Sequence, residues 1–341
     1  MAGPVTNATN GTVMDAAMKT IPVWSAIRLK RTKTNHKTTS KNKTTSNTTP
    51  SKSPALSRMI RLLIDPSHFQ VLPEQLGENP YIHGSLPHHE RKTRAQHQAV
   101  ARAFQHSPVM VERLPPTQTP LSDIVFVANG GLALPRLGRP LILLPNMKYA
   151  HRRAELPYLV RMFRALRIPT IPYPGRRPFE GQAELKWFHG GTKAIGGYGQ
   201  RSTKQAFAEL DHLFTRLYGA KEKPEILTVK LISPTYYHLD VAMLEFDDTK
   251  CVIHRRAVSP RDLSRIQAFL GVENVTVIDT EDSFCLNAVV DGPTLITHKL
   301  TDPAVKPLLE RVTRRRVKQV DTSEFEKSGG SVRCMVLDLH L

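Results

Sequence analysis

Hydrophobic and polar positions follow one another in the same order several times along residues 65–341. A short apolar run that begins beside a polar residue is followed by a Gly or Asp turn and a second apolar run. A stretch with apolar residues every three or four positions comes next, and a third apolar run ends the unit. Runs rich in β-branched and aromatic residues between turn residues predict strands, and the spacing of three and four predicts amphipathic helices. Each unit therefore predicts strand, strand, helix, strand.

Four such units are complete, at 123–174, 183–232, 236–279 and 283–321. A repeat length of about 40–50 residues is typical of propellers and other repeat arrays. A fifth unit is divided between the two ends of the sequence. "SVRCMVLDLHL" at 331–341 supplies its opening strand, and 65–115 supplies the remainder, with a helix near 88–105. Pairing of the last strand with the first segment would close the ring and remove the open edge.

The helix of the 123–174 unit is the clearest example of this patterning. Its apolar residues share one helical face: Leu156, Leu159, Val160, Phe163 and Leu166. Two other helices begin with capping residues, since Thr203 and Ser259 precede the helical spacing and Pro260 fits the first helical turn. The chain is therefore expected to be an α/β protein with a five-fold pseudo-symmetric α/β propeller, a single domain closed by the C-terminal strand.

Charge is unevenly distributed along the 341 residues. The formal net charge is +18, but residues 1–64 hold eleven Lys and Arg against one acid, so the start alone carries +10. The stretch 30–54 has almost no apolar side chains to bury, which predicts disorder. We expect a disordered basic tail over 1–60 and the catalytic propeller over 61–341. The longest apolar runs, such as 141–144, are far too short to span a bilayer, so a soluble protein without a membrane partner is expected.

The tail allows two interpretations. A basic, Ser/Thr-rich, acid-poor start resembles an organelle transit peptide, and a plain solvated tail explains the same composition. The protein is accordingly placed inside the cell, in the cytoplasm, or in a mitochondrion or plastid if the tail is a transit peptide. Three widely separated cysteines give neither a disulfide framework nor metal-site spacing. Nucleic acid is expected as a partner only through the tail.

Each unit places a polar or reactive residue at nearly the same point of its opening run. These residues are Asn129, Glu180, His238 with Asp240, Asn287 and Cys334. Side chains at equivalent positions of a ring converge near its axis, where cysteine, histidine and glutamate would be a nucleophile, a base and its orienting group. His238 and Asp240, two positions apart on a strand, would face the same side. Each residue alone is more often a packing residue, so it is the recurrence that favours a site.

Three motifs in this order resemble those of a known family. "FEGQAEL" at 179–185 is similar to the family's Phe/Leu-Glu-Gly-Gly-Asp segment, "YYHLDVA" at 236–242 to its His-Leu-Asp segment, and "GGSVRCMVL" at 329–337 to its Gly-Gly-x-x-x-Cys terminus. The family is the guanidino-group-modifying superfamily of arginine deiminases, dimethylarginine dimethylaminohydrolases, amidinotransferases and arginine dihydrolases. The resemblance covers about 65–341 and implies a five-bladed α/β propeller, the pentein fold. It implies Cys334 as nucleophile, His238 as general acid and base, Glu180 as its orienter and Asp240 as guanidinium anchor.

The sequence departs from the family at two points. Gln182, Ala183 and Glu184 follow Gly181 where the family has an acidic residue directly after its glycines. Asn129 stands where the resemblance gives deiminases a carboxylate. Arginine dihydrolases have asparagine there and a second one in an Asn-Pro-aromatic segment, which Asn79 matches here. The resemblance also gives two arginines that would bind a substrate carboxylate, Arg201 and one of Arg152 and Arg153.

The sequence therefore predicts a hydrolase that acts on the guanidino group of L-arginine or a close analogue through a covalent thiouronium intermediate on cysteine. A dihydrolase-like reaction to ornithine, ammonia and carbon dioxide is favoured, with dimethylarginine hydrolysis or amidino transfer as alternatives. The thiolate is expected to form beside a bound cation and a protonated histidine. Neither cofactor nor metal is expected, the oligomeric state stays open, and a non-catalytic propeller that binds a guanidino ligand is the alternative of another class.

Overall fold

The computed structural model describes residues 26–28, 59–72, 75, 77–82, 87–118 and 120–340. Of the predicted basic tail over 1–60, only the backbone of strand β1 (Ala26–Arg28) and residues 59–60 are described, and the remainder lies outside the described residues. Within these ranges, no helix is both long enough and apolar enough to cross a membrane.

The described strands form five sheets, none of which closes on itself. The first sheet contains β1, β3 (Val109–Glu112), β2 (Met59–Ile64) and β16 (Leu337–His340). The second contains β4 (Leu132–Ala133), β5 (Ile142–Leu143) and β6 (Thr170–Ile171), and the third contains β7 (Leu185–Phe188), β8 (Lys193–Tyr198) and β9 (Glu225–Lys230). The fourth contains β10 (Met243–Glu245), β11 (Cys251–His254) and β12 (Val275–Ile278), and the fifth contains β13 (Val289–Asp291), β14 (Thr294–His298) and β15 (Arg316–Val320).

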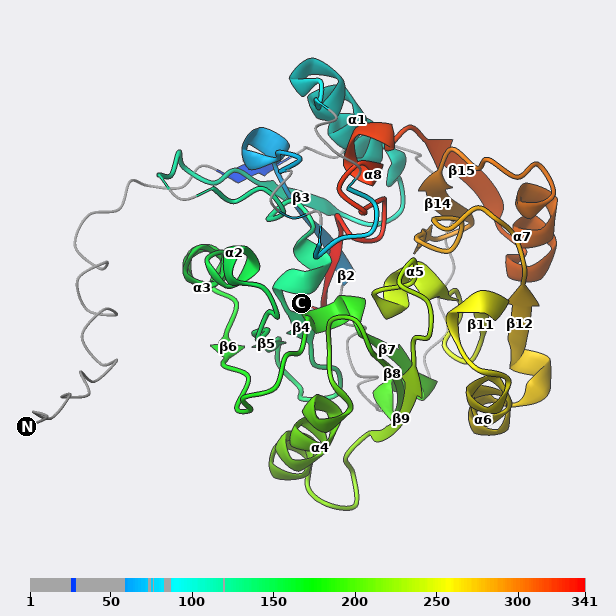
Figure 1. Ribbon diagram of the computed structural model, residues 1–341. Coiled ribbons are helices and arrows are strands. Elements are labelled where there is room, and N and C mark those ends of the chain that lie inside the picture. The colour runs from blue at the N-terminus through cyan, green and yellow to red at the C-terminus, as the bar shows by residue number, and fades with distance from the viewer. Residues whose placement is uncertain are drawn as a thin grey trace, which may run out of the picture.

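One pairing pattern recurs in every sheet. The opening strand pairs antiparallel with the second, and the second pairs parallel with the third across a helical connection. The sheet at the chain ends follows the same rule, because β16 is antiparallel to β2 and β2 is parallel to β3. Leu337 lies opposite Leu62 in this pairing. The last strand therefore joins the first segment as predicted, and Figure 1 shows the sheets following one another around the centre of the molecule.

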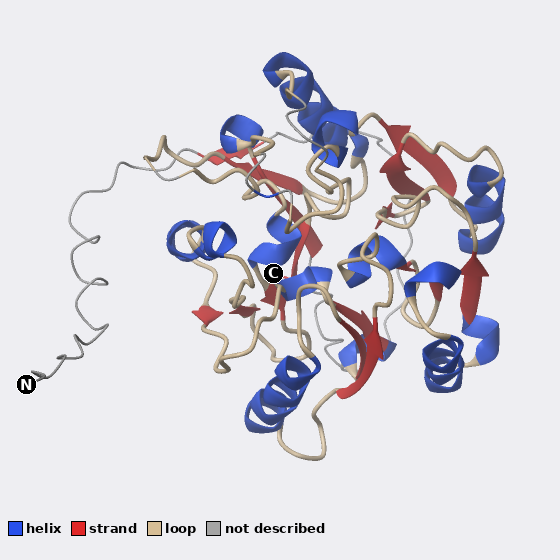
Figure 2. Ribbon diagram, viewed as in Figure 1, coloured by secondary structure: helices blue, strands red, loops and turns tan. Residues whose placement is uncertain are grey.

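The described helices are α1 (Glu90–Ala103), α2 (Ala150–Arg153), α3 (Leu156–Ala165), α4 (Lys204–Tyr218), α5 (Leu239–Ala242), α6 (Pro260–Leu270), α7 (Val305–Thr313) and α8 (Ser323–Glu326). The longer helices lie on the outside of the arrangement (Figure 2), whereas α5 is buried over its whole length and lies near the centre. The predicted caps are confirmed, since the hydroxyls of Thr203 and Ser259 accept from backbone N–H groups three residues on. The 123–174 unit has two helices, α2 and α3, where the pattern predicted one, and the predicted apolar face belongs to α3. Pro157 lies in the first turn of α3, where its missing N–H costs no hydrogen bond.

The apolar faces of helices and strands pack into clusters between neighbouring units. In one of them, Leu244 and Val252 of one sheet meet Leu295 of the next sheet and Leu309 of α7. Complete burial of such a side chain contributes about 1.5–3 kcal/mol. The C-terminal strand takes part, since Leu337 and Leu339 are fully buried. Burial of these leucines and the pairing of β16 with β2 thus hold the C-terminal strand in place. Cys334 lies three residues before this strand and is positioned by it.

Candidate active site

The polar residues that open the units lie on turns and short helices just before the opening strands, which corrects the prediction that they lie on strands. Asn129 is in a 3-10 helix, Val127–Gly130, and Glu180 directly precedes another, Gly181–Ala183. His238 precedes α5, Asp240 lies within it, and Cys334 is in a turn. His238 and Asp240 therefore do not share the face of a strand. Backbone hydrogen bonds at these turns join neighbouring units and are not part of a strand–strand ladder. The Ala128 N–H, for example, donates to the Cys334 carbonyl at 3.1 Å.

Gly181 explains how two of these turns come together. Its φ is +64°, a conformation that side chains disfavour, and a Cβ there would lie 2.7 Å from the Gly131 carbonyl oxygen and 2.8 Å from that of Asn129. Only glycine allows this approach. The Gly after the motif glutamate thus sets Glu180 beside Asn129.

A small cavity of about 10 Å³ lies where the turns meet. It is lined by Asn79, Asp123, Phe126, Asn129, Arg152, Arg201, Tyr237, His238, Ser328 and Cys334. Six of the eight predicted site residues are in this set, and Cys334 and His238 line the cavity together. Glu180 and Asp240 lie just behind it, each in contact with a lining side chain. The volume corresponds to about one water molecule, so an amino acid would need the lining side chains to move.

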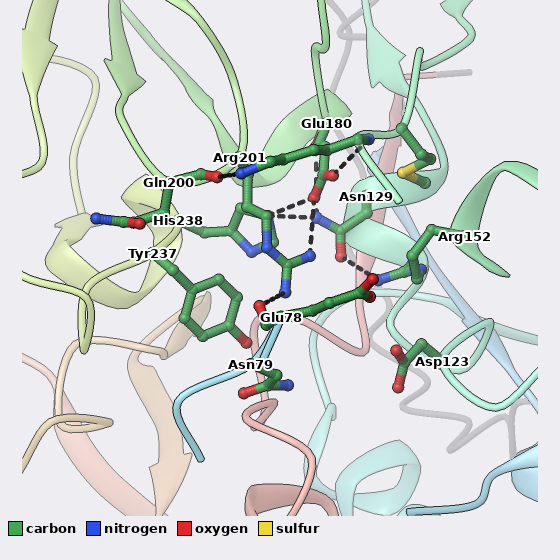
Figure 3. Close-up of polar contacts among 12 residues, drawn as sticks. Glu78, Asn79, Asp123, Asn129, Arg152, Glu180, Gln200, Arg201, Tyr237 and His238 are labelled. Atoms are coloured by element: carbon green, nitrogen blue, oxygen red, sulfur yellow. Dashed lines mark hydrogen bonds and ion pairs between the residues drawn. The ribbon is translucent and has the colours of Figure 1, made fainter. Parts of the chain in front are cut away.

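His238 is bound to Glu180 in the buried wall of the cavity (Figure 3). The imidazole Nε2 is 2.7 Å from Glu180 Oε2, and Glu180 also accepts from Arg201 at 3.4 Å and from the Lys148 backbone N–H at 3.0 Å. Burial alone would raise the pKa of Glu180, but Arg201 and then His238 lower it well below its usual range. Glu180 is therefore ionised and accepts a hydrogen bond from the Nε2–H group of His238, which orients the ring.

The other ring nitrogen is available for chemistry. Among the described residues Nδ1 of His238 has no hydrogen-bond partner, because Glu180 and Asn129 both contact Nε2, Asn129 at 3.3 Å. Burial is the main influence on His238 and lowers its pKa, against the effect of Glu180. The ring is therefore neutral at pH 7 with a free lone pair on Nδ1. The protonated histidine expected beside a bound cation stays a prediction, because this structure contains no ligand.

Cys334 is buried, and its thiol contacts two polar side chains. Asn287 Nδ2 donates to the sulfur at 3.2 Å, and the sulfur is 3.6 Å from Asp240 Oδ2. Burial, and next the Asp240 carboxylate, raise the pKa of Cys334 far above its ordinary value. A resting thiolate is therefore not supported, since the group is a thiol as it stands. Asn287 is the polar residue that opens its unit, and the sequence assigned it no role. Its Oδ1 accepts from the Arg333 and Cys334 N–H groups and so holds this turn.

Asp240 is a buried carboxylate without adequate partners. Within the described part of the chain its Oδ1 has no hydrogen-bond partner, and Oδ2 has only the thiol. Burial raises the pKa of Asp240, and His238 is the first of the groups that oppose this. An unsatisfied buried carboxylate is costly, so the position is suited to receive a cation.

The predicted arginines are buried at the cavity and already engaged. The Arg201 guanidinium lies between the rings of Tyr149 and Tyr237, 4.8 Å from each centroid, and donates to the Glu78 carbonyl at 3.2 Å. Arg152 donates to Asn129 Oδ1 at 3.2 Å and pairs with Glu155 at 2.8 Å.

Three further residues named in the sequence analysis can be placed in the structure. Arg153 is exposed and donates to the Met147 carbonyl, so Arg152 is the arginine at the cavity. Asn79 donates to the Ser328 carbonyl at 2.8 Å and accepts from the Tyr81 N–H. Gln182, at the point of departure from the family motif, donates to the Val336 carbonyl and accepts from Asp338, so it holds the C-terminal strand.

Sequence reasoning missed several residues that line the cavity. Asp123 accepts from Ser328 Oγ at 3.1 Å and contacts His151 at 3.3 Å. Burial would raise the pKa of Asp123, but the hydrogen bond with His151 and then the charge of Arg152 lower it below its usual value. The Tyr237 hydroxyl donates to the Gly329 carbonyl. Asp123 opens the first unit and Tyr237 precedes His238, so nearness to the motifs was the available signal. In the described ranges, no group of three His, Cys, Asp or Glu is arranged to hold a metal ion.

Comparison with known proteins supports the resemblance seen in the motifs. No family model matches the chain. Two relatives are nevertheless named as enzymes that act on guanidino compounds, a dimethylarginine dimethylaminohydrolase and an arginine dihydrolase, so the resemblance carried by the three motifs is confirmed.

Three relatives align with most of this chain. The chain is 29% identical over 287 residues to an uncharacterised protein of Caenorhabditis elegans, covering 82% of this chain and 92% of that protein. It is 26% identical over 268 residues to the N(G),N(G)-dimethylarginine dimethylaminohydrolase of Mycobacterium tuberculosis, 77% of this chain and 80% of that one. It is 27% identical over 286 residues to the bifunctional arginine dihydrolase/ornithine cyclodeaminase AgrE of Nostoc, covering 82% of this chain but only 38% of the relative.

A solved structure shows the same α/β fold. The N-terminal domain of ArgZ, an arginine dihydrolase from the ornithine-ammonia cycle in cyanobacteria, superposes with a TM-score of 0.71 at 21% identity. The match covers 82% of this chain and 97% of that domain. The predicted α/β class is therefore confirmed.

Proposed function

We propose that the protein is a hydrolase of the guanidino group of L-arginine or a close analogue, with Cys334 as nucleophile. The observation that carries this proposal is the pairing of a buried thiol with a buried, incompletely satisfied Asp240 carboxylate at one cavity with His238. A guanidinium presents N–H groups in a planar fork that suits such a carboxylate. Relatives that act on dimethylarginine or arginine support the substrate class.

We propose further that the five sheets are the blades of a five-fold pseudo-symmetric propeller, with residues 61–341 as the catalytic domain. The recurring antiparallel and parallel pairing supports this, together with the β16–β2 pairing across the chain ends. Residues 1–60 would be a basic tail, either a transit peptide or a solvated segment, and the compartment follows from that choice.

In the proposed first half-reaction the substrate cation lies between Asp240 and the thiol. Its positive charge favours loss of the Cys334 proton, and the sulfur then attacks the central guanidinium carbon. The bond from this carbon to one terminal nitrogen breaks, and His238 in its protonated form gives that nitrogen its proton, so that ammonia leaves. The thiol proton supplies the histidine, so charge and protons balance. A thiouronium remains on the sulfur.

In the second half-reaction water attacks this carbon while neutral His238 takes one of its protons. The carbon–sulfur bond breaks, the sulfur leaves as the thiol with the second proton of the water, and the product is a neutral ureido compound. His238 then gives up the proton that it took, which carries away the positive charge of the thiouronium. Proton transfer of this kind is worth about 10²–10⁴ in rate. Glu180 orients the imidazole, and Arg201 and Arg152 would bind the substrate carboxylate.

A dihydrolase repeats the attack on the ureido carbon. Arginine and two waters then give ornithine, two ammonia and carbon dioxide, a balanced reaction. Asn129 and Asn79 favour this version, since neutral amides tolerate an uncharged ureido group better than carboxylates do. The second candidate is dimethylarginine hydrolysis, which the Mycobacterium relative favours.

Incubation of the full chain with L-arginine and with dimethylarginine, followed by product analysis, tests the proposal. The expected result is ornithine with two ammonia per arginine. Citrulline that accumulates without ornithine would overturn the dihydrolase version, and dimethylamine from dimethylarginine would support the second candidate.

A Cys334→Ser variant separates catalysis from mere binding. We expect loss of turnover by at least about 10³, with the substrate still bound in calorimetry. Mass spectrometry of the acid-quenched wild type should find the added mass of a thiouronium on the peptide that contains Cys334. Full turnover by the variant, or binding without any turnover by the wild type, would favour a propeller that only binds guanidino ligands.

A further inference from the structure

Glu155 is a buried carboxyl group that the proposed reaction leaves without a role. It is only 1% exposed and directly precedes α3. Its backbone N–H donates to the Arg152 carbonyl at 3.1 Å, and its own carbonyl accepts from the Tyr158 and Leu159 N–H groups at 2.9 and 3.1 Å. The backbone is therefore fixed where α2 ends and α3 begins. A buried carboxyl group at a fixed point needs a partner there.

The partner of Glu155 is Arg152. Glu155 Oε1 lies 2.8 Å from Arg152 Nε, and both side chains are almost completely buried. A separation of three residues within a helical turn places the two side chains on one face. Arg153, which follows Arg152 in the sequence, is exposed instead. The turn between the helices thus sets the carboxyl group against one edge of the guanidinium.

The opposite edge of the Arg152 guanidinium faces the candidate site. Nη1 donates to Asn129 Oδ1 at 3.2 Å and Nη2 to the Phe126 carbonyl at 3.4 Å, and both of these residues line the small cavity. Figure 3 draws the bond between Arg152 and Asn129. Each terminal nitrogen of a guanidinium carries two hydrogens, so among the described residues one hydrogen on each nitrogen remains beyond these bonds. Those two hydrogens are a fork that can donate to a substrate carboxylate.

We propose that Glu155 is a positioning residue for the substrate: its contact with Nε turns the fork of Arg152 toward the cavity, where the fork binds the substrate carboxylate. The proposal rests on the proposed function in one respect, that Arg152 binds this carboxylate. The guanidinium is planar and rigid, so a group that fixes its Nε edge also fixes the direction of its terminal edge. Burial raises the pKa of Glu155 to about 8, against the opposing charge of Arg152. Near neutral pH the carboxyl group can therefore hold the arginine and leave much of its charge to the substrate.

Replacement of Glu155 should weaken the binding of a carboxylate and little else. Glu155→Met keeps the shape of the side chain and removes its oxygens, so the fork is free to turn away. The KM for L-arginine should rise about 10–100-fold, the range of a hydrogen bond to a charged group, while kcat changes by less than about threefold. Agmatine, which is arginine without its carboxylate, cannot use the fork, so its KM should stay within about threefold of the wild-type value. Glu155→Gln keeps an oxygen in place of Oε1 and should restore the KM for L-arginine.

Glu324→Met is the matched control. Glu324 of α8 is also only 1% exposed, and its carboxylate lies 2.8 Å from Nζ of Lys327, three residues on, but neither residue lines the cavity. This variant should lose stability and keep both KM values. Circular dichroism and thermal melts first establish that each variant is folded. If Glu155→Met does not fold, Glu155→Ala removes the same oxygens with less bulk.

Binding measurements separate this proposal from the proposed function. Calorimetry with L-arginine and with agmatine on the Cys334→Ser chain, with and without Glu155→Met, measures affinity without turnover. A loss of affinity for L-arginine alone supports the positioning role even if the wild type hydrolyses neither compound, in which case only the proposed function fails.

Three results would overturn the positioning role. An equal loss of affinity for both ligands, or for neither, removes it and leaves the hydrolase proposal standing where the wild type turns over arginine. If agmatine is not bound at all, a KM for L-arginine that is unchanged in Glu155→Met, or that is not restored by Glu155→Gln, removes it as well. A chain that does not bind L-arginine overturns both proposals.

Discussion

Glu180→Gln is the sharpest perturbation of the candidate site, because it changes one atom of a buried carboxylate that orients His238. Ionised Glu180 only accepts hydrogen bonds, so it fixes the proton on Nε2 and leaves the lone pair on Nδ1. The amide of glutamine can donate to Nε2 instead. The proton then moves to Nδ1, and the ring loses the basic nitrogen that is free in the wild type. We expect kcat to fall by about 10²–10⁴, the usual contribution of a positioned acid–base group.

The stability cost follows from the same contacts. Arg201 loses the carboxylate 3.4 Å away while it remains buried between two tyrosine rings. Breaking a buried ion pair costs about 3–5 kcal/mol, and the aromatic faces should reduce this to about 2–3 kcal/mol. For a domain of this size that lowers Tm by roughly 4–12 °C.

Steady-state kinetics with L-arginine and thermal melts measure both effects. Asp291→Asn is the matched control, since Asp291 is also buried but does not line the cavity. Its carboxylate accepts hydrogen bonds of 2.6–2.9 Å from three backbone N–H groups. That variant should lose stability and keep kcat. A Glu180→Gln protein with kcat within threefold of wild type would refute the role of Glu180 as orienting group. Restored activity at high pH would also count against it, because a wrong tautomer is not corrected by titration.

Two further variants test the structure around the site. His298 is buried between Asp282 at 2.8 Å and Glu326 at 3.3 Å; burial lowers its pKa, but the hydrogen bonds to these carboxylates raise it to about 9. Its contribution to stability should be complete below about pH 6.5 and be lost as the pH rises through about 9, which urea unfolding from pH 6 to 10 would show; a His298→Gln protein with the same pH dependence contradicts this. Gly181→Ala should cost at least about 2 kcal/mol and most of the activity, since its Cβ would meet a carbonyl oxygen at 2.7 Å. Gly219→Ala, also at positive φ but with nothing within 4 Å, should cost about 1 kcal/mol; equal losses in unfolding assays would contradict the clash.

The order of elements was predictable because local patterns determine it. Alternation and helical spacing need only nearby residues, so each strand–strand–helix–strand unit could be recognised, as could the caps at Thr203 and Ser259. Strand lengths were not predictable, because a strand extends only as far as its partner does. The apolar run at 141–144 contains a strand of two residues, Ile142–Leu143.

The position of the site was predictable from recurrence, and its chemistry only in part. Residues at equivalent points of the units do meet at one cavity, but on turns, because inter-unit hydrogen bonds replace the expected ladders. Charge states depend on burial and on distant partners. A linear sequence gives no measure of either, so the raised pKa of Cys334 and the lowered pKa of His238 in the ligand-free protein could not be read from it.

These charge states have a consequence for the proposed reaction. Burial disfavours the charged forms of Cys334, His238 and Asp240 alike. A guanidinium that enters carries one positive charge into a site of low dielectric, where it stabilises the anionic forms of the thiol and of Asp240. The substrate would thus create the nucleophile that attacks it, with Nδ1 of His238 as the acceptor of the released proton. Uncharged analogues of the same shape should leave the thiol protonated, so alkylation of Cys334 by iodoacetamide at pH 7 should be no faster with them than without ligand. A short guanidinium ion that leaves the sulfur accessible should accelerate that alkylation, and a rate independent of the charge of the added ligand would contradict this coupling.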